Sequence, residues 1–208
     1  AAQSKLLEPE NLSTTELSYI YRQAQRKFIS TVFYTQYMNL IERVVIPGQL
    51  PRYENVGEVI SQGAELEWVE YFDDKWQLRG NVSFADTLDE RDVDQELTGA
   101  VNWLANIIID WQMSTDLSHH VLLKYVGEQE GAELPNLRIP HEDSFNEFYT
   151  LDYSLAYQNA FGKQNMLMRF DIKNLTDQTW QAQSYQTQWP EGLNQGSRSF
   201  HLALEYEF

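Results

Sequence analysis

Apolar and polar residues alternate over most of this 208-residue chain, and this period of two limits the fold more than any other feature. In the segment 76–84, the residues Trp76, Leu78, Val82 and Phe84 fall on one side of an extended chain, and the polar residues between them fall on the other. Successive side chains of a β-strand point to opposite faces, so the pattern predicts strands with one apolar face. No long helical period competes with it, and the expected fold class is all-β and antiparallel.

We expect nine strands, at 16–24, 27–41, 59–71, 76–86, 100–113, 117–126, 147–160, 164–176 and 197–208. The connections between them alternate in length. Those near 25–26, 72–75, 114–116 and 161–163 are short, and those at 42–58, 87–99, 127–146 and 177–196 are long. An up-and-down transmembrane β-barrel has short periplasmic turns and longer external loops, whereas a Greek-key sandwich would spread its loop lengths over both ends.

Aromatic residues recur eight positions apart within four of these strands. The pairs are Trp76 with Phe84, Trp103 with Trp111, Tyr149 with Tyr157, and Phe200 with Phe208. Both members of a pair share a face, and in a tilted strand they lie roughly 20 Å apart along a barrel axis. This fits the aromatic girdles that flank the ~25 Å apolar band of a membrane barrel. The alternative is a soluble sandwich or lipocalin-like barrel whose aromatic residues form the core.

Composition excludes several classes of function. The formal net charge of −16 argues against nucleic acid as a partner, because such partners need basic patches. The absence of cysteine removes disulfides, thiolate metal sites and thiol catalysis. No apolar run approaches the ~20 residues of a membrane-spanning helix, although barrel strands escape that test.

The polar face of the strands carries charges of both signs. In a barrel these residues line the lumen, and they comprise Glu65, Glu67, Arg79, Asn81, Asp110, Lys124, Asp152, Arg169, Asp171, Lys173, Glu205 and Glu207. Mixed signs on neighbouring strands indicate cross-strand ion pairs or contacts to something inside the barrel. The simpler interpretation of any single residue is a solvated wall position.

The residues that could act as catalytic groups or metal ligands do not form a recognisable catalytic or metal site. The four histidines, at 119, 120, 141 and 201, show no H-x-x-x-H spacing, and no G-x-S-x-G elbow is present. A Ser-His-Asp triad assembled from distant positions stays open. Asp92-x-Asp94-x-Glu96 has calcium-loop spacing without the glycine and distal glutamate of an EF-hand, so a solvated external loop is expected there. Our prediction is a protein without catalytic residues, metal site or nucleotide cofactor.

Four segments resemble motifs of the TonB-dependent outer-membrane receptor barrels, in the family's order. They are Glu8-Pro9-Glu10-Asn11-Leu12 with Glu16-Leu17; Tyr53-Glu54-Asn55-Val56-Gly57 with Gln62-Gly63-Ala64-Glu65-Leu66-Glu67; Phe170-Asp171-Ile172-Lys173-Asn174-Leu175-Thr176-Asp177 with Trp180; and Gly196-Ser197-Arg198-Ser199-Phe200 with Phe208. Together these segments span nearly the whole chain.

The resemblance implies an outer-membrane location in a Gram-negative bacterium and a barrel of 22 strands around an N-terminal plug. Residues 1–208 would then be the C-terminal part of the barrel, with the plug and the earlier strands outside this chain. An odd count of nine strands agrees, because bacterial single-chain barrels have even numbers. The implied partners are outer-membrane lipid and lipopolysaccharide, the plug and remaining strands, the TonB complex, and the barrel-assembly machinery acting through Phe208.

The expected function is import of a scarce ligand such as a ferric siderophore, with this chain providing barrel wall and external loops. The expected ligand-facing loop residues are Arg138, His141, Trp180 and Trp189, although Trp180 could equally belong to the outer aromatic girdle. Two alternatives remain open at this point. One is a small self-contained outer-membrane porin or adhesin of eight or ten strands, and the other is a soluble all-β sugar-binding protein.

Overall fold

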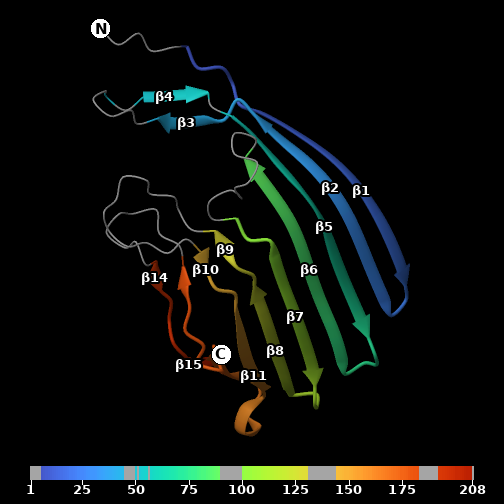
Figure 1. Cartoon of the computed structure of the whole chain (residues 1–208). Coiled ribbons are helices and arrows are strands. Elements are labelled where there is room, and N and C mark those ends of the chain that lie inside the picture. Colours follow the sequence, from blue (N-terminus) through green and yellow to red (C-terminus); the bar gives the residue numbers. More distant parts are fainter. Residues whose placement is uncertain are drawn as a thin grey trace.

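The computed structural model describes residues 6–44, 50, 52–55, 57–89, 100–130, 144–182 and 192–207. Nine long strands form one antiparallel sheet in which each strand pairs with its neighbours in sequence (Figure 1). They are β1 (Asn11–Gln23), β2 (Arg26–Met38), β5 (Glu58–Tyr71), β6 (Trp76–Asp89), β7 (Trp103–Gln112), β8 (Leu117–Val126), β11 (Phe148–Gln158), β12 (Met166–Lys173) and β15 (Ser199–Tyr206). The predicted up-and-down order of nine strands is confirmed.

Short polar turns join the strands at one end of the sheet. In the turn after β5, the Asp73 carboxylate accepts hydrogen bonds from the backbone N–H groups of Lys75 and Trp76. In the turn before β8, the Ser114 hydroxyl accepts one from Leu117. Asp and Ser side chains stabilise tight turns in this way, by taking up backbone donors that the ladder leaves free. The turns therefore form locally and set the register of the hairpins.

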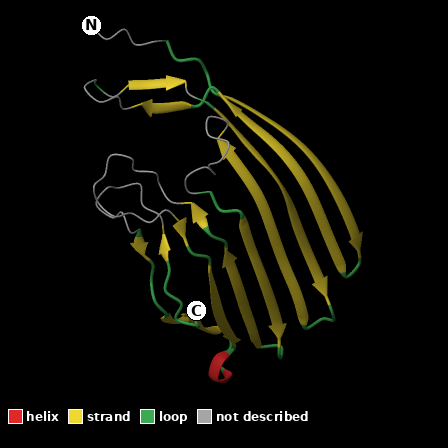
Figure 2. Cartoon of the chain, viewed as in Figure 1, coloured by secondary structure: helices red, strands yellow, loops and turns green. Residues whose placement is uncertain are grey.

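The long connections carry secondary structure of their own, which the sequence did not predict. Three short hairpins extend beyond the sheet at the opposite end (Figure 2). They pair β3 (Ile41–Val44) with β4 (Arg52–Asn55), β9 (Gln129–Glu130) with β10 (Ser144–Phe145), and β13 (Gln181–Ala182) with β14 (Leu193–Asn194). A 3₁₀ turn, η1 (Ala160–Gly162), follows β11. The described part of the chain contains no helix with the length and hydropathy to cross a bilayer.

Several strand ends lie at asparagines in the left-handed conformation. Asn39 follows β2 with φ of 59°, Asn159 follows β11 with φ of 48°, and Asn165 and Asn174 bracket β12 with φ of 65° and 52°. Asparagine tolerates this region better than most residues, and a residue in it cannot continue a strand. The second, seventh and eighth strands are consequently shorter than predicted. In contrast, β1 begins at Asn11, five residues before its predicted start.

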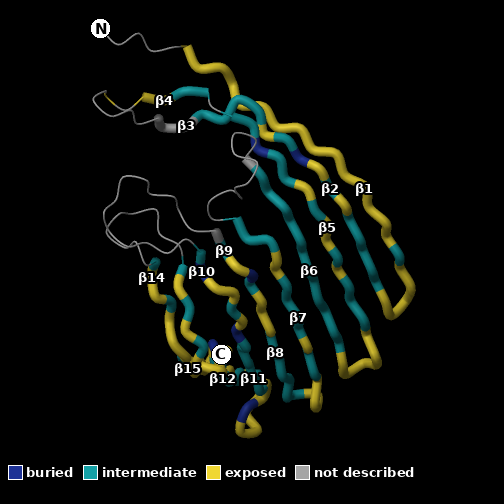
Figure 3. Tube along the Cα trace, viewed as in Figure 1, coloured by how far each residue is buried: buried dark blue, intermediate teal, exposed yellow. Residues whose placement is uncertain are grey.

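The two faces of the sheet are those that the alternation predicts. Cross-strand pairing places Trp76 opposite Trp111, Leu78 opposite Ile109, and Phe84 opposite Trp103 on one face. Large apolar side chains on this face are exposed, with Trp76 39% and Leu204 58% accessible. Figure 3 shows how few segments are buried. Among the described residues the buried apolar ones are Val59, Phe145 and Ala160, so these aromatic residues do not form a dry core as a soluble sandwich would require.

Both edges of the sheet lack a partner strand within the described residues. β1 pairs only with β2, and β15 pairs only with β12. β1 is thirteen residues long and almost wholly exposed, so it presents a long row of free backbone donors and acceptors. A spanning sheet in lipid tolerates no such edge, because each unsatisfied backbone group costs several kcal/mol there, on the order of the transfer cost of a bare amide.

Candidate functional site

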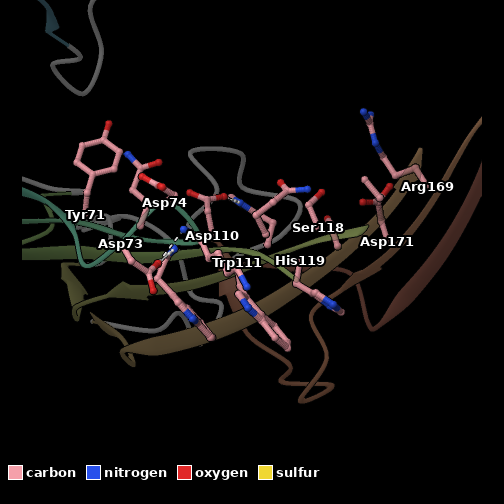
Figure 4. A pocket seen from close by; sticks show the side chains of 16 residues that line it. Tyr71, Asp73, Asp74, Asp110, Trp111, Ser118, His119, Arg169 and Asp171 are labelled. Carbon is pink, nitrogen blue, oxygen red and sulfur yellow. Dashed lines mark hydrogen bonds and ion pairs between the residues drawn. The ribbon is translucent and has the colours of Figure 1, made fainter. Parts of the chain in front are cut away.

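The polar face forms the concave wall of the sheet. A hollow of about 570 Å³ on this face is lined, among others, by Asp110, Ser118, His120, Ser154, Arg169 and Asp171. Figure 4 shows Asp110, Arg169 and Asp171 on one side of the ribbon, and Trp111 and His119 on the other. Polar side chains of β7, β8, β11 and β12 line this hollow together, as they can where the sheet curves towards them, and Trp111 and His119 border it near the short turns. The polar side chains therefore face the inside of the curve and the apolar ones face outward.

An ion-pair network crosses three strands of this concave wall. Asp110 on β7 accepts a hydrogen bond from Arg79 Nη2 on β6 at 2.7 Å through Oδ2. Its other oxygen, Oδ1, lies 2.7 Å from Nδ1 of His120 on β8. All three side chains are partly exposed, so the network is wet and its contribution to stability is modest. This confirms that charges of the predicted lumen row pair across strands.

A second cluster anchors the loop that follows β12. Asp152 on β11 pairs with Lys173 Nζ at 3.1 Å, and its other oxygen accepts the backbone N–H of Asn174 at 2.8 Å. The buried side-chain amide of Asn174 donates to the Gln178 carbonyl and accepts from the Gln178 N–H. The Asn174-Leu175-Thr176-Asp177 motif is thus a folded turn whose polar groups are used within the chain.

The outer face carries a ladder of stacked rings near the short turns. Trp76 and Trp111 stack with ring centroids 4.9 Å apart and planes 7° from parallel. His119 stacks on the other side of Trp111 at 4.8 Å, and its Nδ1 hydrogen-bonds the Tyr153 hydroxyl at 2.8 Å. Near the loop end, Phe84 and Trp103 form a second contact at 4.8 Å. Two aromatic levels on one exposed face match the girdles expected of a barrel wall.

Trp180 lies on the concave side and not in the outer girdle. Its ring stacks on Phe148 with centroids 4.7 Å apart and planes 12° from parallel. Phe148 pairs with Val126 on the polar face of the sheet, so Trp180 covers the inner wall near the loops. It borders a hollow of about 410 Å³ together with Asn146, Glu147, Gln178 and Asn194. The arrangement offers a flat aromatic ring beside amide and carboxylate groups.

The other sequence-predicted site residues cannot be placed. Arg138, His141, Trp189 and Phe208 lie outside the described residues, as does the acidic segment containing Asp92, Asp94 and Glu96. Within the described residues no cluster of three or more potential metal ligands occurs.

The described histidines do not form a catalytic triad. The Ser199 hydroxyl lies 3.2 Å from His201 Nε2, and Asp171 is the cross-strand partner of His201. No hydrogen bond joins His201 to Asp171 among the side chains that the structure describes. For His201 the third link that would orient the imidazole is missing, whereas His120 has the Asp110 carboxylate but no hydrogen bond to a hydroxyl among the described residues.

One feature of the loop end was missed by the sequence analysis. The β3–β4 hairpin extends from the ends of β2 and β5 towards the side on which β9–β10 and β13–β14 lie (Figure 1). Its Tyr53 is 62% exposed, and Arg52 forms an ion pair with Glu54 on the same strand. The signal available in the sequence is the Tyr53-to-Gly57 motif, which lies in the connection expected at 42–58 and resembles part of the family's strand pair.

Comparison with known proteins identifies the architecture. The sequence profile described as "TonB dependent receptor-like, beta-barrel" matches residues 2–175. A comparison with curated protein sequences gave no match.

The fold is similar to that of solved receptors with known cargo. The chain is 16% identical to the ferric-catecholate import receptor Fiu from E. coli K12 (TM-score 0.79), covering 97% of this chain and 28% of that one. It is 15% identical to the ferripyoverdine receptor of the outer membrane of Pseudomonas aeruginosa (TM-score 0.77), covering 98% and 28%. It is 16% identical to the copper transporter OprC (TM-score 0.75), covering 98% and 32%. The chain thus spans about a third or less of the length of these proteins, which are transport receptors and not enzymes.

Proposed function

Because the chain belongs to the TonB-dependent receptor β-barrel family, we propose that it is the C-terminal part of the barrel of an outer-membrane receptor that imports a scarce ligand such as a ferric siderophore. It forms barrel wall and external loops and supplies no chemistry. The observation that carries the proposal is the division of the nine-stranded sheet into an exposed apolar face with two aromatic levels and a charged concave face. Lipid meets the first face and a filled or wet lumen meets the second.

The free edges support the assignment to a larger barrel. β1 and β15 do not pair with each other among the described residues, so nine strands alone leave two edges open. Further strands of a longer polypeptide would close them, and a plug domain would contact the charged wall around Asp110 and Arg169. The self-contained porin of eight or ten strands is less well supported, since it requires direct closure of the two edges.

The ligand proposal comes from the loop end. The stacked Trp180 beside Asn146, Glu147 and Gln178 suits a planar, polar chelate, and the similar receptors carry ferric chelates or copper. Together with Trp180, the residues Arg138, His141 and Trp189 of connections 127–146 and 177–196 are proposed ligand contacts. Lipopolysaccharide, the TonB complex and the barrel-assembly machinery are proposed partners of the complete receptor.

Transport by the full-length receptor in a Gram-negative host without its own ferric receptors tests the function. We expect uptake of ⁵⁵Fe bound to a catecholate or hydroxamate chelate, and loss of that uptake when the host's TonB is deleted. Cu²⁺ uptake is the parallel assay for the other cargo class. Passage of small solutes that is independent of TonB, without chelate binding, would instead favour a porin.

Two variants locate the binding surface. Deletion of loop 127–146 should weaken chelate binding while leaving assembly intact, and unchanged binding would refute the role of that loop. Trp180→Ala should weaken binding, whereas Trp180→Phe keeps a ring on Phe148 and should retain most of it. Equal losses in both Trp180 variants would mean that stacking is not the contact.

A further inference from the structure

The β3–β4 hairpin is fastened at its base by two side chains, one from β4 itself and one from the segment that precedes β1. Asn55 is the last residue of β4 and pairs in register with Ile41, the first residue of β3. The pair therefore stands where the hairpin leaves the sheet. Both members of the pair are held by a hydrogen bond to the segment that precedes β1.

Asn55 makes three hydrogen bonds to two other parts of the backbone. Its Oδ1 accepts the N–H of Glu8 at 2.7 Å, and its Nδ2 donates to the Glu8 carbonyl at 2.8 Å. The same Nδ2 donates to the carbonyl of Asn39 at 2.7 Å. The side-chain amide pairs with Glu8 as a backbone peptide would in an antiparallel ladder. One residue thus joins the end of β4, the end of β2 and the segment before β1.

Glu10 fastens the other strand of the hairpin. Its carboxylate accepts the backbone N–H of Ile41 at 2.8 Å. Hydrogen bonds to a charged acceptor are stronger than neutral ones, and here the donor is the first residue of β3. With Asn55 holding β4 and Glu10 holding β3, the hairpin cannot swing about its base without breaking hydrogen bonds on both sides.

The fastening matters because the hairpin presents an exposed aromatic ring at the loop end. Tyr53 stands two residues from Asn55 on the same strand and is 62% exposed. Pre-organised loops bind more tightly, because they have already lost the conformational freedom that binding would otherwise remove. A free hairpin of two four-residue strands is marginal in water, so its order depends on such contacts.

We propose that Asn55, supported by Glu10, is a positioning residue that holds the β3–β4 hairpin over the mouth of the barrel as a ligand-facing element, with Tyr53 as its contact to the chelate. The role of Tyr53 in chelate binding rests on the proposed function, whereas the role of Asn55 in holding the hairpin does not. The hairpin is a third binding segment beside the loops 127–146 and 177–196.

Two readouts on the intact full-length receptor test the proposal. The first is trypsin cleavage after Arg43 or Arg52 in whole cells, which needs no ligand. The second is binding of the ferric catecholate and hydroxamate chelates to the purified receptor.

Asn55→Ala removes three hydrogen bonds and should speed cleavage at least about tenfold. Asn55→Asp keeps the acceptor for Glu8 but turns a carboxylate oxygen towards the Glu8 and Asn39 carbonyls, so it should not restore slow cleavage. Asn11→Ala is the matched control and should behave as wild type, because the exposed Asn11 side chain hydrogen-bonds only Pro9 among the described residues.

Binding should fall several-fold in both Asn55→Ala and Tyr53→Ala, while only the former speeds cleavage after Arg43, a bond that Tyr53→Ala leaves unchanged. Unchanged cleavage in Asn55→Ala would overturn the fastening. Faster cleavage with unchanged chelate binding would overturn the ligand-facing role of the hairpin. If the wild-type receptor binds neither chelate, the proposed function fails while the cleavage assay still decides the role of Asn55.

Discussion

The indole ring of Trp68 on β5 lies over Gly80 on β6 and fills the space that a side chain would take. A Cβ added to Gly80 would stand 2.2 Å from Cζ2 of Trp68. The two residues are register partners on the outward face, so the glycine makes room for a large ring in the middle of the apolar band. An aromatic residue that covers a strand glycine restores the packing that the glycine lacks.

Gly80→Ala should therefore destabilise the full-length receptor by about 1–3 kcal/mol, the usual cost of overpacking. The cost arises because Trp68 must leave its position to admit the methyl group. Guanidinium unfolding of the receptor in phospholipid vesicles measures it. Gly196→Ala is the control, since an added Cβ there meets nothing within 4 Å. Equal midpoints for the two variants would show that Trp68 does not pack on Gly80.

The assignment of faces predicts opposite results for arginine on the two sides of the wall. Ile107 stands midway between Trp103 and Trp111 on the outward face, so Ile107→Arg places a charge near the middle of the bilayer at a cost of about 2–4 kcal/mol. Ser83→Arg lies on the concave face opposite the exposed Glu65 and should cost little. Folding yield into vesicles and unfolding midpoints compare the two. A larger loss from Ser83→Arg would reverse the assignment of lipid and lumen.

Replacing Asn174 should destabilise the protein, and two substitutions can separate the loss of its side-chain hydrogen bonds from the backbone strain at this position. Asn174→Gly keeps the left-handed backbone of φ 52° and loses the side-chain bonds to Gln178. It should destabilise by about 1–3 kcal/mol, because the Gln178 backbone groups lose their partners. Asn174→Ala loses the same bonds and adds backbone strain, so it should be worse by roughly 1 kcal/mol. If the alanine variant is as stable as the glycine variant, the strain argument is wrong.

The nine long strands and their two faces could be predicted because a strand with one face in lipid repeats every two residues. The cross-strand register then follows from turns that close locally, such as those at Asp73 and Ser114. The predicted positions of the strand ends are less accurate. The stop at Asn39 depends on a left-handed backbone, and the early start at Asn11 lies in a stretch without alternation.

The loop hairpins and the side-chain hydrogen bonds that hold them could not be predicted from the alternation of apolar and polar residues. β9, β10, β13 and β14 have two residues each, too few to show a period. Asn55 and Asn174 were visible as members of motifs, but their partners are backbone atoms, up to 47 residues away in the case of Glu8. No sequence spacing encodes such a bond. Likewise, the sequence alone is compatible with Trp180 in the outer girdle or on the inner wall, and only its stacking on Phe148 places it on the inner wall.

The last prediction concerns the ring ladder at the turn end of the outer face. Trp111 contacts rings on both sides, Trp76 at 4.9 Å and His119 at 4.8 Å, whereas Trp76 stacks only on Trp111 among the described rings. Trp111→Ala should therefore cost more than Trp76→Ala in unfolding free energy. Ring pairs contribute about 0.5–1.5 kcal/mol beyond the area they bury, so the double variant should fall short of the summed single costs by about that amount. Unfolding of all four proteins in vesicles closes this double-mutant cycle. Additive costs would mean that the two indoles anchor the wall to the membrane interface independently, and that their parallel stacking adds nothing.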